Sequence, residues 1–160
     1  MSAPWTIRKA TVADAVDMAA CVNAAYEHYV ARMQQTPGPM LDDYAIAAQH
    51  PGAFVAVQDG SVVGILVLIE DPERMLLDNI AVYPRAQVTG LGRALLMHAD
   101  AHTLARGYSE LWLYTHEQMH ENIEMYSRAG FIETHRLNEK GFARVYMCKR
   151  LNDQQPQDGQ

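Results

Sequence analysis

The first candidate for chemistry is the loop Gln87-Val88-Thr89-Gly90-Leu91-Gly92, which is followed by Arg93. A predicted strand ends just before this loop, and a predicted amphipathic helix begins within it. The first amides of a helix have no acceptor inside the helix, and the helix dipole adds positive potential there. Gly90 and Gly92 would let an anion approach the backbone closely. The loop therefore predicts a phosphate-binding turn.

Two familiar phosphate loops do not fit this sequence. A P-loop needs Gly-Lys-Ser/Thr, whereas the chain has Gly92-Arg93-Ala94. A dinucleotide-binding loop needs a third glycine where the chain has Leu95. Taken alone, a Gly-x-Gly segment is more often an ordinary strand-to-helix turn, so the loop needs support from the rest of the sequence.

A second candidate is the pair Asn122 and Tyr126, which are four residues apart and share one face of a predicted helix. A tyrosine hydroxyl can give a proton to a leaving group. The same spacing also fits packing, because Met119, Ile123 and Tyr126 form an apolar stripe, while Asn122 could face solvent. Spacing alone favours the packing interpretation.

Two stretches of the chain resemble the signatures of the GNAT N-acetyltransferase superfamily. Residues 79–96 resemble its cofactor motif, Gln/Arg-x-x-Gly-x-Gly/Ala after a strand that ends near Val-x-Pro. Residues 122–131 resemble its second signature, in which an Asn precedes a helical Tyr and a Gly-Phe opens the next strand. Two signatures in the right order are more specific than one loop. The close match covers residues 75–131, and the order of elements extends it over most of the chain.

The resemblance implies that acetyl-CoA is the cofactor. No metal site is expected, because only His98 and His102 have a ligand-like spacing and they lack nearby acidic partners. The coenzyme A diphosphate would lie on the loop and helix start, formed by Gln87, Val88, Thr89, Gly90, Leu91, Gly92 and Arg93. The pantetheine arm would run along Ile80, Ala81 and Val82. Asn122 would contact the cofactor, and Tyr126 would be the general acid that protonates the leaving thiolate.

The general base is less constrained. Asp78 lies on the predicted cofactor strand, near the place where some members of the family carry an acidic base. His116 follows the next predicted strand and has a suitable unperturbed pKa, although it also fits a surface loop. Water relays could replace either group.

The acceptor pocket is expected near the first predicted helix and the loop after it. Tyr26, Tyr29, Met33 and Met40 could hold a small amine with an apolar body. The same side chains could equally be core packing, and both interpretations stay open.

The implied reaction is transfer of an acetyl group from acetyl-CoA to a primary amine by direct attack, with a small-molecule or amino-acid-like acceptor. One alternative is a protein or peptide N-acetyltransferase. Another is a non-catalytic acyl-CoA-binding regulatory module. Homodimers are frequent in the family, so a homodimer is an expectation by analogy. The sequence fixes neither the acceptor nor the preference for acyl chains.

Composition narrows the class of protein. The chain has 160 residues, is 49% hydrophobic and carries a formal net charge of -6. Such an acidic chain is a poor candidate for nucleic-acid binding. No apolar run approaches the roughly 20 residues that cross a bilayer, and the N-terminus lacks a secretion signal, so a cytoplasmic protein without a membrane partner is expected. Cys21 and Cys148 are expected to be buried, reduced packing residues.

The elements predict an α/β (α+β) fold with a mixed, mostly antiparallel central sheet of about seven strands and helices on both faces. A single domain is expected over 1–151, followed by a mobile polar tail, 152–160. Strands are expected at Trp5–Lys9, Ala53–Gln58, Ser61–Glu70, Met75–Tyr83, Glu110–Thr115, Phe131–Arg136 and Phe142–Lys149. Helices are expected at Thr11–Tyr29, Leu41–Gln49, Leu91–Arg106 and Met119–Ala129.

Overall fold

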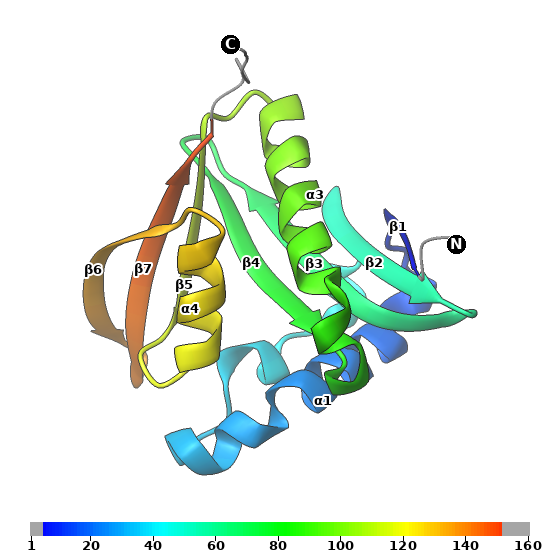
Figure 1. The fold of residues 1–160 in the computed structure, drawn as a ribbon, viewed down its shortest axis with the longest axis horizontal. Coiled ribbons are helices and arrows are strands. Elements are labelled where there is room, and N and C mark those ends of the chain that lie inside the picture. The colour runs from blue at the N-terminus through cyan, green and yellow to red at the C-terminus, as the bar shows by residue number, and fades with distance from the viewer. Residues whose placement is uncertain (1–4, 152–160) are drawn as a thin grey trace.

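The computed structural model describes residues 5–151, which form a seven-stranded sheet with helices on both faces (Figure 1). The strand order is β1-β2-β3-β4-β5-β7-β6. β4 and β5 are parallel neighbours, and the remaining neighbours are antiparallel. The expected mixed sheet is confirmed. Its strands are β1 Thr6–Lys9, β2 Gly52–Gln58, β3 Ser61–Glu70, β4 Met75–Val82, β5 Glu110–His116, β6 Ile132–Glu139 and β7 Phe142–Arg150.

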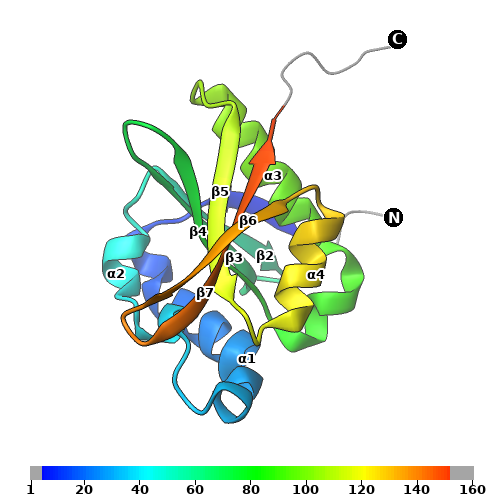
Figure 2. The ribbon, with the colours of Figure 1, turned by 90° about the vertical axis from the view of Figure 1, so that its left-hand side faces the viewer.

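Four α-helices cover the two faces of the sheet. They are α1 Ala15–Met33, α2 Tyr44–Ala47, α3 Leu91–Ala105 and α4 His120–Arg128. Helices α1 and α2 pack on one face, and α3 and α4 pack on the other (Figure 2). Alternate residues of the central strands point to opposite faces of the sheet. Ile65 packs in the core beneath α1 and α2, and Leu66 packs in the core beneath α3 and α4.

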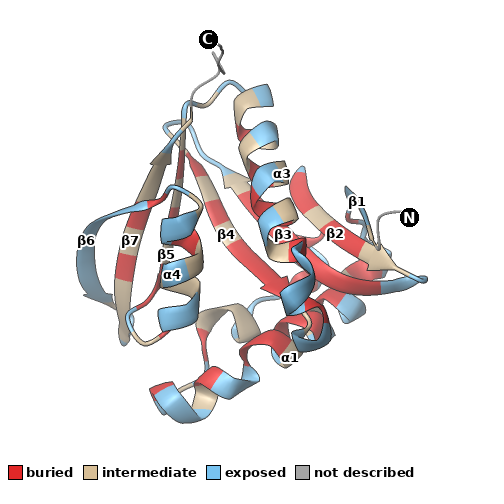
Figure 3. Ribbon diagram, viewed as in Figure 1, coloured by how far each residue is buried: buried red, intermediate tan, exposed pale blue. Residues whose placement is uncertain are grey.

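Strand β3 is buried from Val62 to Leu68, which fits its nearly continuous apolar sequence (Figure 3). The turn that joins it to β2 has positive φ at Asp59 (52°) and Gly60 (79°). Two successive positive φ values are the type I′ geometry expected for Asp-Gly. This hairpin pairs β2 with β3, and β4 pairs with β3 on its other side.

Strands β4 and β5 part soon after they meet. They pair only through Met75–Leu111 and Leu76–Trp112. Beyond that point β4 stays with β3 as far as Val82, and β5 stays with β7 as far as His116. The two strands therefore splay apart, which opens a gap in the middle of the sheet.

A β-bulge marks the place where β4 leaves β5. Val67 pairs with Asn79 and Leu68 pairs with Leu77, so Asp78 is the extra residue of β4. Bulges re-aim side chains, and this one sets Asp78 at the mouth of the gap.

Some predicted boundaries were wrong. The capping box of Thr11 and Asp14 is present, but α1 runs to Met33 and not to Tyr29, because nothing breaks it before Gln34 takes a left-handed φ of 56°. The helix expected over Leu41–Gln49 is reduced to α2, preceded by a 3-10 turn at Gly38–Leu41. The side chain of Asp43 accepts hydrogen bonds from two α2 amides and starts that helix late.

Both cysteines are free, as expected, but Cys148 is only half-buried, because it lies on β7 near the open edge of the sheet. The expected tail at 152–160 lies outside the described residues. Within residues 5–151, no helix is both long and apolar enough to span a bilayer. The described part of the chain holds no cluster of three or more His, Cys, Asp or Glu side chains placed to bind a metal.

Candidate active site

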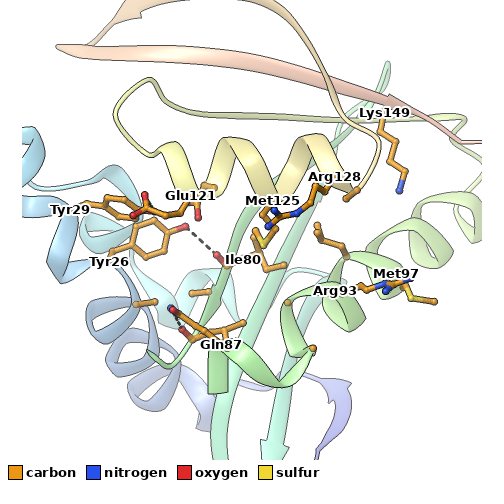
Figure 4. A pocket seen from close by; sticks show the side chains of 18 of the residues that line it. Tyr26, Tyr29, Ile80, Gln87, Arg93, Met97, Glu121, Met125, Arg128 and Lys149 are labelled. Carbon is orange, nitrogen blue, oxygen red and sulfur yellow. Dashed lines mark hydrogen bonds between the residues drawn. The ribbon is translucent and has the colours of Figure 1, made fainter. Parts of the chain in front are cut away.

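A channel of about 990 Å³ lies between α3 and α4, over the end of β4 that is separated from β5 (Figure 4). Its walls come from α1, β4, the loop before α3, α3, α4 and the end of β7. Of the residues predicted to bind the cofactor, the channel is lined by Ile80, Ala81, Val82, Gln87, Gly90, Gly92, Arg93 and Asn122. The structure therefore brings both sequence signatures to one channel.

The loop at the start of α3 presents backbone amides to this channel. Gly90 has a φ of 90°, a left-handed conformation that favours glycine. The first bond of α3 joins the Ala94 amide to the Gly90 carbonyl, so the amides of Leu91, Gly92 and Arg93 have no acceptor within the helix. Such a helix start suits a diphosphate.

Gly92 keeps the passage between the two helices open. A Cβ built at Gly92 would lie 3.5 Å from Sδ of Met125 on α4, so a larger side chain would enter the channel. The open helix start and the width of the channel both fit coenzyme A, whose diphosphate needs amide donors and whose arm needs a long passage.

Two other side chains of the loop hold its backbone in place through hydrogen bonds to carbonyl groups. Gln87 Nε2 donates a hydrogen bond to the Val82 carbonyl at 3.1 Å, and Thr89 Oγ1 donates to the Ala86 carbonyl at 2.6 Å. The side chain of Val88 is 94% exposed, and that of Leu91 is buried in the core. Neither Val88 nor Leu91 lines the channel. Only their backbones could serve a cofactor.

Sequence reasoning missed three charged side chains that line the channel, two basic and one acidic. Arg128 of α4, Lys149 of β7 and Asp100 of α3 line it together with Arg93 (Figure 4). Lys149 Nζ donates to Asp100 Oδ2 at 2.6 Å. Nothing in the sequence brings position 149 near position 93, because β7 reaches this place only through the sheet.

A second cavity, of about 270 Å³, opens where β4 and β5 separate. Tyr26 of α1 borders both this cavity and the channel. Asp78, His116, Tyr126 and Met33 line the second cavity, so most of the expected catalytic and acceptor residues come together. The wall is completed by Gly38, Pro39, Asp42, Leu77, Asn79, Tyr114, Thr115, Met119, Lys140, Phe142 and Arg144.

Two of the predicted acceptor residues lie elsewhere. Tyr29 lines the channel, and its hydroxyl donates to Glu121 Oε1 at 3.4 Å. Met40 lines neither cavity and packs, partly buried, against the core beneath α1. The expected acceptor set is thus divided between two cavities and the core.

Tyr126 is 4% exposed, and its ring meets Phe131 edge to face at 5.7 Å between centroids. Burial raises its pKa well above the ordinary value, so the phenol is protonated at neutral pH. Among residues 5–151 its hydroxyl makes no hydrogen bond, although it lines the second cavity. A hydroxyl at the cavity wall with no protein partner is available as a donor to a molecule in that cavity.

Asp78 is a half-buried carboxyl group on the bulge. Burial and, to a smaller extent, the carboxylate of Asp42 raise its pKa, while His50 lowers it, and the net pKa is about 6. A carboxylate with this pKa is ionised at neutral pH and is a stronger base than an exposed aspartate.

His116 is buried, contrary to the surface-loop interpretation, and burial lowers its pKa. Its Nδ1 accepts a hydrogen bond from the Gln118 amide at 3.1 Å. A neutral imidazole that accepts at Nδ1 carries its proton at Nε2, so this histidine faces the cavity as a donor. Asp78 is therefore the better placed base.

A buried hydrogen-bonded chain joins β4 to the segment that follows α1. The Tyr26 hydroxyl lies 3.2 Å from Asn79 Oδ1 and 3.1 Å from the Ile80 carbonyl (Figure 4). Asn79 Nδ2 donates to the Tyr44 hydroxyl at 2.6 Å, and that hydroxyl donates to the Pro39 carbonyl at 2.7 Å. Sequence reasoning missed this chain; its only signal was the polar Asn79, next to Asp78, in a strand whose other residues are apolar.

Comparison with known proteins places these features in context. The model of a family described as the acetyltransferase (GNAT) family matches residues 19–131. The [ribosomal protein bS18]-alanine N-acetyltransferase of Escherichia coli K12 is 35% identical over 80 residues, which are 50% of this chain and 54% of that protein. The chain thus spans about half the length of the curated relatives it matches.

Solved structures share the fold. The PaiA N-acetyltransferase of Thermoplasma acidophilum, solved in complex with coenzyme A, has a TM-score of 0.75 at 18% identity, over 94% of this chain and 99% of that one. The ribosomal-protein-S18-alanine N-acetyltransferase of Escherichia coli has a TM-score of 0.74 at 24% identity, over 92% and 94%. At these identities the likeness concerns the fold.

Proposed function

Because the chain belongs to the GNAT acetyltransferase family, we propose that it is an acetyl-CoA-dependent N-acetyltransferase with a small-molecule or amino-acid-like primary amine as acceptor. The family uses acetyl-CoA, and one solved structure of the same fold contains coenzyme A. The acceptor is the part of the proposal that depends on this chain's own residues.

One observation carries the proposal: the channel and the second cavity share Tyr26 at the gap between β4 and β5. A cofactor held in the channel would thus meet an acceptor held in the cavity. Asp78 and Tyr126 both line the cavity, so a base and an acid face the same place.

Acetyl-CoA would supply an acetyl thioester. The amine nitrogen would form a C–N bond to the carbonyl carbon of the acetyl group, and the C–S bond would break. Asp78 would take the proton that the ammonium must lose before attack, and Tyr126 would give a proton to the departing sulfur. The second proton, which the nitrogen loses after attack, would restore the phenol of Tyr126. The amides at the start of α3 and the backbone of Ile80–Val82 would hold the cofactor in register with the cavity. The reaction needs no covalent enzyme intermediate, and Cys21 is buried with a pKa raised by burial, so it is no nucleophile.

The size of the second cavity supports a small acceptor. Its 270 Å³ is slightly below the range of pockets that hold drug-sized ligands. Gln35 Nε2 donates to the Gly141 carbonyl at 3.3 Å and ties the segment after α1 to the β6–β7 turn, from which Lys140 and Phe142 line the cavity.

A second candidate is acetylation of a protein N-terminus. The observation that favours it is the 35% identity with the ribosomal-protein-alanine N-acetyltransferase over 80 residues, which are half of this chain. A protein acceptor would place one N-terminal residue in the cavity and leave the rest of its chain outside.

Thiol release from acetyl-CoA tests the proposal. The panel comprises simple amines, free amino acids and peptides with N-terminal alanine, and mass spectrometry identifies the acetylated product. We expect release that depends on a small amine. Preference for the peptides would support the second candidate. Coenzyme A binding by calorimetry, without release for any amine, would instead indicate a non-catalytic acyl-CoA-binding module.

A further inference from the structure

The second cavity carries opposite charges at its two ends. Asp78 of β4 and Asp42, which follows the Gly38–Leu41 turn, lie on one side. Arg144 of β7 and Lys140 of the β6–β7 turn lie on the other. His116 also lines the cavity and is neutral at pH 7, since burial lowers its pKa. The cavity is thus dipolar, which differs from a site built for a simple cation.

Arg144 is fixed in position and keeps donors to spare. Its side chain is 18% exposed, and its guanidinium lies 4.2 Å from the centre of the Tyr114 ring. Glu139 Oε1 accepts a hydrogen bond from Nη1 at 3.1 Å and another from the Tyr146 hydroxyl. The Tyr146 hydroxyl also interacts with the guanidinium, which has five N–H groups, so donors remain for an anion in the cavity that Arg144 lines.

Tyr114 stands between the two charged ends. Burial raises the pKa of its phenol, Arg144 lowers it, and the carboxylates of Asp78 and Asp42 raise it. The Tyr114 side chain is therefore close enough to feel the charges of both ends, and its ring adds apolar surface to the cavity wall.

An independent feature also points to a ligand here. Tyr126 is 4% exposed and lines the cavity, and its hydroxyl makes no hydrogen bond to another of residues 5–151. The hydroxyl is not sealed in the core, so its donor is free for a ligand in the cavity. The reacting end of the acceptor therefore belongs near Tyr126 and Asp78, and the rest of the acceptor extends toward Arg144.

We propose that the acceptor is a zwitterion, a primary amine that also carries a carboxylate, such as a free amino acid. Its ammonium faces Asp78 and Asp42, and its carboxylate binds the guanidinium of Arg144 across the Tyr114 ring. Guanidinium groups suit this task because their fork matches a carboxylate. A diamine or an internal amide of a peptide offers Arg144 no anion. This inference rests on the proposed function, whose acceptor class it narrows.

The test compares each amino acid with its own carboxamide, which keeps the amine and side chain but lacks the carboxylate. Thiol release gives kcat/KM, and calorimetry on the protein loaded with coenzyme A gives binding. For wild type we expect the acid to exceed the amide by about 10- to 100-fold, the usual effect of a charged hydrogen bond. Equal values, or a preference for the amide, would overturn the inference.

A pair of arginine variants on the same hairpin sharpens the test. Arg144→Gln should raise the KM for the acid by about 10- to 100-fold, leave the KM for the amide unchanged and spare coenzyme A binding. Arg136→Gln is the control, because Arg136 pairs with Glu133, is exposed and lines neither cavity. An equal loss for acid and amide in Arg144→Gln would contradict carboxylate binding. Should that variant fail to fold by thermal melting, the wild-type comparison decides.

The two proposals fail in different ways. Release with amides or peptides but not with acids would overturn the zwitterion and leave acetyl transfer standing. Binding of acids in preference to amides, without thiol release for any amine, would support the zwitterion site and contradict the proposed activity.

Discussion

The channel and the second cavity meet at Tyr26, yet they are built in different ways. The part of the channel that fits a diphosphate consists of backbone amides within one short segment at the start of α3. The cavity consists of side chains from α1, the Gly38–Leu41 turn, β4, β5, α4 and the β6–β7 hairpin. Backbone geometry tolerates changes of side chain, whereas an assembled set of side chains can be retuned one residue at a time. The channel is thus suited to one constant cofactor and the cavity to a particular acceptor.

The largest expected effect breaks the channel alone. Gly90→Asp should weaken coenzyme A binding by more than about 1,000-fold, because a carboxylate would face the diphosphate at the helix start. Gly90→Asn is the matched control, since asparagine tolerates the left-handed φ of 90° about as well and carries no charge. Calorimetry measures both. Equal affinities for the two variants would show that the diphosphate binds elsewhere.

The next effect breaks the cavity and leaves the channel intact. Asp78→Asn should lower kcat by about 1,000-fold without changing coenzyme A affinity, because the base is removed. The same variant should be more stable at pH 8, by about 1–3 kcal/mol, because the raised pKa makes ionised Asp78 unfavourable in the folded state. Denaturant unfolding checks the second effect. Retained turnover would transfer the role of base to another group.

Tyr126→Phe deletes one hydroxyl at the same end of the cavity. We expect kcat to fall by about 100-fold, near the lower limit for acid catalysis, because a thiol is a fairly good leaving group. Coenzyme A affinity should not change. Full turnover in the variant would contradict the role as acid and indicate that Tyr126 only packs against Phe131.

The pH profile sharpens the assignment of the base. The pKa of Asp78 is about 6, so the carboxylate is ionised above that value and protonated below it. At pH 5 about one molecule in ten keeps the base ionised, and kcat should be about tenfold lower than at pH 7. The rate of wild type across pH 4.5–8 measures this. A flat profile, or one unchanged in Asp78→Asn, would argue against Asp78.

The smallest effect concerns the hydrogen-bonded chain that joins the two regions. Tyr44→Phe removes the bond to the Pro39 carbonyl and leaves Asn79 Nδ2 without its acceptor. Stability should fall by about 1–2 kcal/mol. The KM for the acceptor should rise a few-fold, while coenzyme A affinity stays constant. A change in coenzyme A affinity instead would mean that this chain supports the channel.

The difference between the two regions also explains what the sequence could predict. The loop from Gln87 to Arg93 and the pair Asn122 and Tyr126 are local patterns, so their elements and approximate boundaries could be anticipated. The seven strands and the buried β3 followed from apolar runs and turn residues in the same way.

The remaining features depend on contacts between distant parts of the chain. Lys149 reaches Asp100, and Arg144 reaches the cavity that Asp78 also lines, only because β7 lies beside β5. Met40 was expected in the acceptor pocket because it is close in sequence to residues that line it, but its side chain packs on the core. The short α2 escaped prediction because a cap at Asp43 outweighs the helical pattern before it.

The most direct test of the account is a crystal structure of the protein with coenzyme A. We predict the diphosphate on the amides of Leu91, Gly92 and Arg93, with the thiol end at the gap between β4 and β5, facing Tyr126. A diphosphate bound away from that helix start, or a thiol end directed away from the cavity that holds Asp78, would contradict it.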